Sequence, residues 1–144
     1  MIDIYFELER MRFDNQFYFI KDLNTEKYNH IQIPTMILQP IFESVIRHGK
    51  IGKLEVQGKL YFNVNEENNH LVFDLRHNGI KIDTKNKYND SSKNDHSSLA
   101  IDIINERIEI CDHSYNLDIH YIMKSLEDNK HKTQVSIFLN LKNL

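Results

Sequence analysis

A carboxylate, a hydroxyl and an imidazole lie within one short stretch of the chain, on Glu43, Ser44 and His48. Groups of these kinds can hold the water shell of a metal ion or contact a phosphate. Each also has an ordinary structural role. Glu43 suits the solvated side of a helix, and His48 suits a helix end, where a cation is favoured. The residues alone leave both interpretations open.

The remaining reactive side chains form no recognisable metal or disulfide pattern. Cys111 is the single cysteine, which excludes an internal disulfide and a multi-cysteine zinc cluster, and we expect it to be a small buried hydrophobe. The histidines outside the motifs discussed below lack the spacing of metal ligands and are expected at the surface or in loops: His30, His70, His96, His113, His120 and His131.

Length and composition indicate one domain of a reduced, cytosolic protein. The chain has 144 residues, a net charge of −3 and 40% hydrophobic residues, which is typical of a globular domain. No basic excess points to nucleic acid. No apolar run approaches the roughly 18 residues of a membrane span. The acidic residues Asp3, Glu7 and Glu9 argue against a signal peptide at the amino end.

Apolar periodicity predicts three helices. The best is 34–48, where Ile37, Ile41 and Val45 fall on one apolar face and Gly49 is the expected stop signal. A helix over 99–110 follows later in the chain. A helix over 3–13 has an apolar side made by Ile4, Leu8 and Met11.

Alternating apolar and polar residues predict strands between and after the helices. These strands cover 17–19, 54–64, 71–75, 117–123 and 135–141. Residues 83–98 carry Tyr88 as their single large side chain and are expected to form a long, mobile, lid-like loop. Alternation implies one wet face of the sheet and one face covered by helices. The sequence therefore predicts an α/β fold, a two-layer sandwich of a mixed sheet with helices on one face.

Four segments together resemble one protein family. Residues 33–49 read Ile-Pro-Thr-Met-Ile-Leu-Gln-Pro-Ile-Phe-Glu-Ser-Val-Ile-Arg-His-Gly, and this stretch resembles the N-box helix of LytS-type sensor histidine kinases. Residues 5–13 resemble the stretch that precedes the catalytic domain in that family. Residues 77–82 fall at its first glycine box, and residues 105–108 match the end of its second.

The resemblance implies the Bergerat ATP-binding fold, a two-component system and a Mg-ATP cofactor. In that family the domain passes the γ-phosphoryl group to a histidine on an upstream dimerisation helix of the same protein. Residues 1–14 would be the end of the linker or dimerisation helix, and 15–144 the ATPase-like domain. The implied partners are the upstream helix, a cognate response regulator and a second copy of the protein, with no nucleic acid. The implied location is a cytoplasmic domain of a membrane-anchored parent.

The resemblance also assigns roles on the 34–48 helix. Glu43 would assist proton transfer or hold metal-bound water. Ser44 stands where the family has the Mg²⁺-binding asparagine and would reach the metal through a water. His48 matches a family histidine and would contact phosphates.

The two glycine boxes depart from the family pattern. His77 replaces the aspartate that reads adenine, while Asn78 and Gly79 keep the turn. Ser98 and Ala100 replace glycines whose bare amides cradle phosphates at a helix N-terminus. Thr133 is retained, and it would either reach a phosphate or be an ordinary strand threonine. The resemblance therefore implies a kinase-type domain in which Mg-ATP binding is weak or absent.

Two other functions remain open at this stage. The domain could be a non-catalytic pseudokinase module that keeps the scaffold and works by packing or dimerisation. Alternatively, the remodelled pocket could bind a different small ligand.

Overall fold

The computed structural model describes residues 2–14, 16–23, 26–28, 30–33, 35–81, 96–128 and 130–143. Three α-helices lie at α1 (Ile2–Arg12), α2 (Thr35–His48) and α3 (His96–Tyr115) in this part of the chain. Its strands are β1 (Phe17–Leu23), β2 (Gly58–Glu67), β3 (His70–His77), β4 (Ile119–Ser125) and β5 (Thr133–Asn140).

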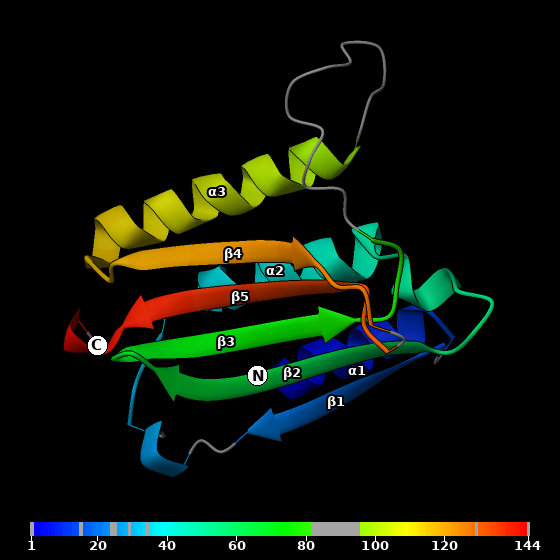
Figure 1. The fold of residues 1–144 in the computed structure, drawn as a ribbon, viewed down its shortest axis with the longest axis horizontal. Helices are drawn as coiled ribbons and strands as arrows, with labels where there is room; N and C mark the ends of the chain where they lie inside the picture. Colours follow the sequence, from blue (N-terminus) through cyan, green and yellow to red (C-terminus); the bar gives the residue numbers. More distant parts are fainter. Residues whose placement is uncertain are drawn as a thin grey trace.

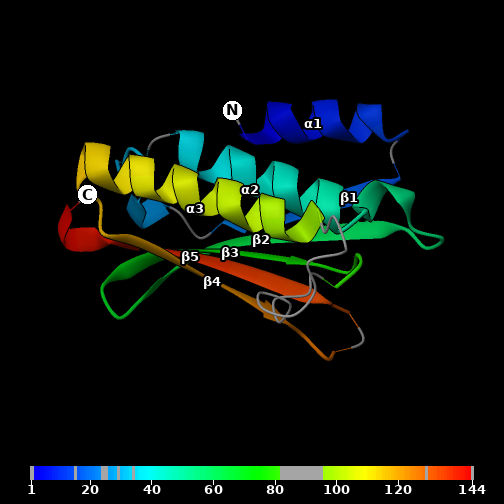
Figure 2. The same cartoon turned by 90° about the horizontal axis from the view of Figure 1, so that it is seen from above.

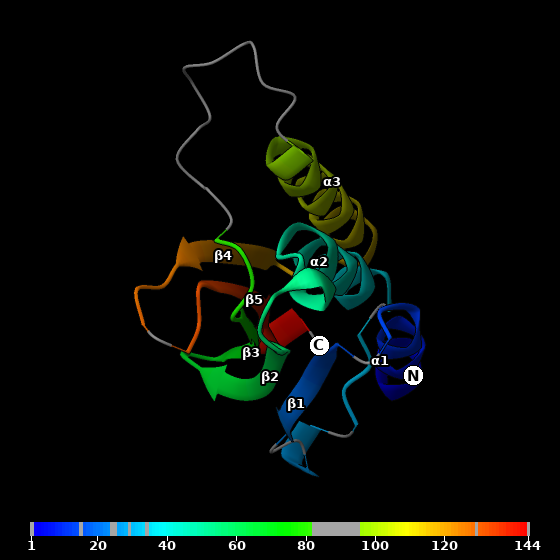
Figure 3. The same ribbon diagram turned by 90° about the vertical axis from the view of Figure 1, so that its right-hand side faces the viewer.

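The strands form one mixed sheet in the order β1-β2-β3-β5-β4. β1 runs parallel to β2, and the other neighbouring pairs are antiparallel. All three helices cover the same face of this sheet, as the views from above and from the side show (Figures 2 and 3). The predicted two-layer α/β sandwich with helices on one face is confirmed.

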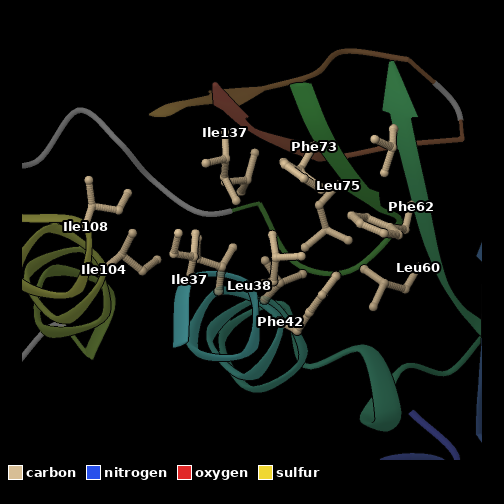
Figure 4. Packing of buried hydrophobic residues seen from close by; sticks show 14 of the residues in the cluster. Ile37, Leu38, Phe42, Leu60, Phe62, Phe73, Leu75, Ile104, Ile108 and Ile137 are labelled. Carbon is tan, nitrogen blue, oxygen red and sulfur yellow. The ribbon is translucent and has the colours of Figure 1, made fainter. Parts of the chain in front are cut away.

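The core lies between this sheet face and the helices (Figure 4). Ile37, Ile41 and Val45 of α2 are all buried, as their spacing predicts. Side chains from α3 and from β2, β3 and β5 close the same cluster. Burial of one such side chain stabilises the fold by about 1.5–3 kcal/mol, so α2 is the main anchor of the helix layer.

Helix α1 is present as predicted, but its expected apolar side faces outward. Ile4, Leu8 and Met11 are 68%, 58% and 61% exposed. Phe6 is buried instead, with its ring stacked on Phe19 at 3.6 Å between centroids. Contacts of Phe6 with aromatic rings of other elements therefore decide which side of α1 packs inward.

Several predicted boundaries differ from the structure. The predicted strand 54–64 begins only at Gly58, and Val56 before it is 68% exposed. A methyl group at Gly58 would lie 2.2 Å from the carbonyl oxygen of Ile51, so the chain first folds tightly after α2. Helix α3 is longer than the predicted 99–110, since it runs from His96 to Tyr115.

Most of the predicted 83–98 loop, including Tyr88, lies outside the described residues. Among the residues that the structure describes, no helix is both long and apolar enough to span a membrane.

Candidate functional site

The structure brings four of the predicted site residues to one end of the sheet. His77 is the last residue of β3, and Asn78 and Gly79 follow it directly. In the strand register His77 lies opposite Thr133 at the start of β5. Both of these side chains are fully buried. The turn formed by the expected first glycine box therefore lies close to Thr133 of β5, beneath the carboxyl end of α2.

Two glycines let the turn after β3 approach α2. A methyl group at Gly79 would lie 2.2 Å from the carbonyl oxygen of Gly49, and one at Gly49 would lie 2.8 Å from Cε1 of His77. The backbone amide of Ile80 donates a hydrogen bond of 2.8 Å to the Gly49 carbonyl. Neither glycine has a positive φ, and the left-handed residue at the helix end is Lys50. Close approach, rather than backbone conformation, requires these two glycines.

The imidazole of His77 is held in one neutral form. Its Nδ1 accepts a hydrogen bond of 3.1 Å from the backbone amide of Gly79. Burial lowers the pKa of His77 to about 4, so the ring is neutral at pH 7. A neutral ring that accepts at Nδ1 carries its proton on Nε2. This buried Nε2 has no hydrogen-bond partner among the described residues.

Asn78 has a structural task at the start of β2. Its Oδ1 accepts a hydrogen bond of 2.7 Å from the amide of Lys59, and its Nδ2 donates one of 3.0 Å to the carbonyl of Gln57. The side chain therefore fastens the turn after β3 to the neighbouring strand. The same two groups cannot also serve a ligand without releasing that strand.

Helix α2 separates the residues predicted on it. Glu43 accepts a hydrogen bond of 3.0 Å from Gln39 and lines a hollow of about 430 Å³ beside Glu9 and Arg12 of α1. Burial first, and then the charges of Glu9 and Glu43, raise the pKa of Tyr5 in α1. Glu43 thus faces α1.

Ser44 and His48, in contrast, are half-buried and lie one helical turn apart. They share a side of α2 that Glu43 does not occupy. Ser98 and Ala100 are the third and fifth residues of α3, and their side chains lie outside the described part of the structure.

One polar cluster was missed by sequence reasoning. Asp74 is only 8% exposed, although strand alternation places it on the wet face of the sheet. It binds Ser136, Gln134 and Arg76. The sequence does show polar residues at alternate positions of β3 and β5. This pattern predicts that they share a face of the sheet, but it does not predict that Asp74 is buried.

The arrangement of helices and strands in this chain is found in solved proteins. The structure superposes on the nucleotide-free catalytic domain of histidine kinase ThkA with a TM-score of 0.61 and 13% identity, covering 98% of this chain and 89% of that one. This is the fold of histidine kinase catalytic domains. A mycobacterial sensor histidine kinase, MprB, aligns with a TM-score of 0.59 and 13% identity over 96% of this chain and 90% of that one.

The sequence comparisons add no match to this structural likeness. No family model matches the sequence, and no curated protein matches it either. The likeness to histidine kinase catalytic domains is thus one of fold.

Proposed function

We propose that this chain is the ATP-binding module of a two-component sensor histidine kinase in which Mg-ATP binding is weak. Two observations support the proposal. The fold is that of histidine kinase catalytic domains. Gly49 and Gly79, which belong to two of the segments that resemble the LytS-type family, approach each other closely at the end of α2.

The state of His77 carries the argument for weak binding. An aspartate reads adenine by accepting a hydrogen bond from the exocyclic amine, because a carboxylate is acceptor-only. In His77 the acceptor nitrogen is already bonded to Gly79, and the other nitrogen carries a proton. The ring therefore offers the amine no free acceptor. Losing such a contact, or leaving it unpaired, costs about 1–3 kcal/mol.

The metal and phosphate contacts are weakened as well. Mg²⁺ needs several oxygen ligands in near-octahedral geometry. Ser44 offers one hydroxyl, and Glu43 lies on the α1 side. Ser98 and Ala100 put a side chain at each former phosphate-binding glycine. These residues fit Mg-ATP poorly, and three losses of this size move a micromolar dissociation constant to about the millimolar range or beyond.

The parent protein would follow the family arrangement. Residues 1–14 would end the linker or dimerisation helix that carries the phosphoacceptor histidine, and 15–144 would be the ATPase-like domain. The partners would be that helix, a second copy of the protein and a response regulator. The domain would lie on the cytoplasmic side of a membrane-anchored receptor.

A non-catalytic interaction module is the second candidate, and one observation favours it. Ile4, Leu8 and Met11 leave an apolar stripe of α1 uncovered among the described residues, at a spacing that suits helix pairing. A pseudokinase would use such a surface without turning over ATP. A pocket adapted to another ligand is the third candidate, because the Nε2 proton of His77 calls for an acceptor.

Restoring the family residues tests the proposal. The variant combines His77→Asp, Ser44→Asn, Ser98→Gly and Ala100→Gly, and nucleotide binding is measured by calorimetry with and without Mg²⁺. We expect at least a tenfold gain in affinity for ATP, dependent on Mg²⁺. Glu55→Gln, outside the site, is the matched control and should change nothing. An unchanged affinity in a folded restored variant would contradict the proposed cause of weak binding.

A further inference from the structure

The sheet face opposite the helices contains a hollow of about 680 Å³. This face is turned toward the viewer in Figure 1, where α1 and α2 lie behind the strands. Its volume falls within the 300–1,000 Å³ typical of small-molecule sites. Its lining combines three cations, Arg76, Lys124 and Lys130, with neutral polar groups such as Asn63 and Asn65.

The floor of the hollow is a fixed polar network. The buried carboxylate of Asp74 accepts hydrogen bonds from Ser136 Oγ at 2.7 Å and from Gln134 Nε2 at 2.5 Å. Its other oxygen lies 2.6 Å from Nη2 of Arg76. Asp74 therefore holds the guanidinium of Arg76 in place. A guanidinium has five N–H donors, so most of them are left for a second acceptor.

Arg76 and Lys124 stand on either side of Gln134. The register pairs Gln134 with Arg76 on β3 and with Lys124 on β4. Their backbones are thus two strand spacings apart, about 10 Å. Side chains of this length can both reach a group placed above Gln134. In the described part of the chain, Lys124 and Lys130 form no ion pair with a carboxylate.

The turn between β4 and β5 forms a wall of the hollow. The ring of His131 packs edge-to-face on Tyr61 of β2, with centroids 4.7 Å apart. Asp128 accepts a hydrogen bond of 2.7 Å from the amide of Lys130 and pairs with His131 at 3.0 Å. The amide of Lys132 donates to the carbonyl of His77 at 2.7 Å. The wall that carries Lys130 is therefore tied to the sheet at several points.

We propose that this hollow binds a small organic anion, with its phosphate or carboxylate group held by Arg76, Lys124 and Lys130. The amides of Asn63 and Asn65 would bond the hydroxyl groups of the same molecule. Asp22 and Glu67 line the hollow too and disfavour a ligand that is anionic throughout. The occupant is thus a molecule with one anionic end and one neutral polar end. The site lies on the sheet face away from α2 and does not depend on the proposed nucleotide function.

Chemical shifts of the isotopically labelled 17.2 kDa chain provide the test. The probes are glucose 6-phosphate, gluconate and inorganic phosphate, with glucose as the uncharged control. We expect saturable shifts at Arg76, Gln134 and Lys124 with glucose 6-phosphate or gluconate, and none with glucose. Tighter binding of glucose 6-phosphate identifies a phosphate ligand, and tighter binding of gluconate identifies a carboxylate ligand. Raising the salt concentration should weaken binding.

Variants separate this site from general charge effects. Lys124→Gln does not touch Asp74 and should lower the affinity about tenfold. Arg76→Gln should lower it further, although that variant also removes a partner of Asp74. Lys53→Gln, on the helix side of the molecule, is the matched control and should leave the affinity unchanged. No saturable shift up to about 10 mM of any anionic probe, or equal losses in Lys124→Gln and Lys53→Gln, overturns the proposal.

Discussion

The backbone amide of Gly79 donates a hydrogen bond of 3.1 Å to Nδ1 of His77, and this contact fixes the protonation form of a fully buried imidazole. A ring held in this way can donate at Nε2 but has no free acceptor. The difference from an aspartate at the same position is therefore one of hydrogen-bond polarity as well as of size.

Stability should fall on mild acidification because of His77. Burial lowers the pKa of His77 in the folded state to about 4, against 6.5 ordinarily. Below pH 6.5 the unfolded chain therefore binds a proton at this residue more readily than the folded chain does. The free energy of unfolding should drop by about 3 kcal/mol as pH falls from 6.5 to 4. Urea unfolding at pH 7 and pH 5 measures the slope. His77→Gln should flatten it, and an equal slope in that variant would show that other groups are responsible.

Gly79→Ala should destabilise the chain through contact with α2. The added methyl group would lie 2.2 Å from the Gly49 carbonyl oxygen, which would push the turn away from the helix end. Overpacking of this kind costs about 1–3 kcal/mol. Thermal unfolding measures the loss, with Ile80→Ala as the matched control because that side chain is exposed. A Gly79→Ala variant as stable as the wild type would mean that the turn does not pack on Gly49.

Phe6 should anchor α1, and Leu8 should not. The Phe6 ring stacks on Phe19 and meets Phe42 edge-on at 4.8 Å, whereas Leu8 is exposed. Phe6→Ala should cost about 3–5 kcal/mol of unfolding free energy, and Leu8→Ala less than about 0.5 kcal/mol. Chemical denaturation compares the two. A larger loss of stability in Leu8→Ala than in Phe6→Ala would instead support the orientation of α1 suggested by the spacing of Ile4, Leu8 and Met11.

The sequence predicts best the elements whose burial follows from their own periodicity. Ile37, Ile41 and Val45 repeat along α2, and the structure buries all three. The orientation of α1 does not follow in this way. Burial of Phe6 depends on Phe19 and Phe42, which belong to other elements. A local sequence pattern cannot predict a contact between side chains of different elements.

The candidate site, too, could be predicted from the sequence only in part. The sequence predicts that Asn78 and Gly79 keep a turn, and in the structure they follow His77, the last residue of β3. The form of the His77 ring depends on the geometry of the Gly79 amide. The burial of Asp74 depends on the register between β3 and β5. Neither relationship can be predicted from the spacing of residues in the sequence.

Calorimetric titration of the unmodified chain with Mg-ATP tests the central claim most directly. We predict a dissociation constant of about 1 mM or weaker, because under the proposed function the base, metal and phosphate contacts would all be weakened. Heats measured with ATP alone provide the comparison without Mg²⁺. A dissociation constant of about 10 μM or tighter would contradict the account and would assign the chain to the ATP-binding kinases without qualification.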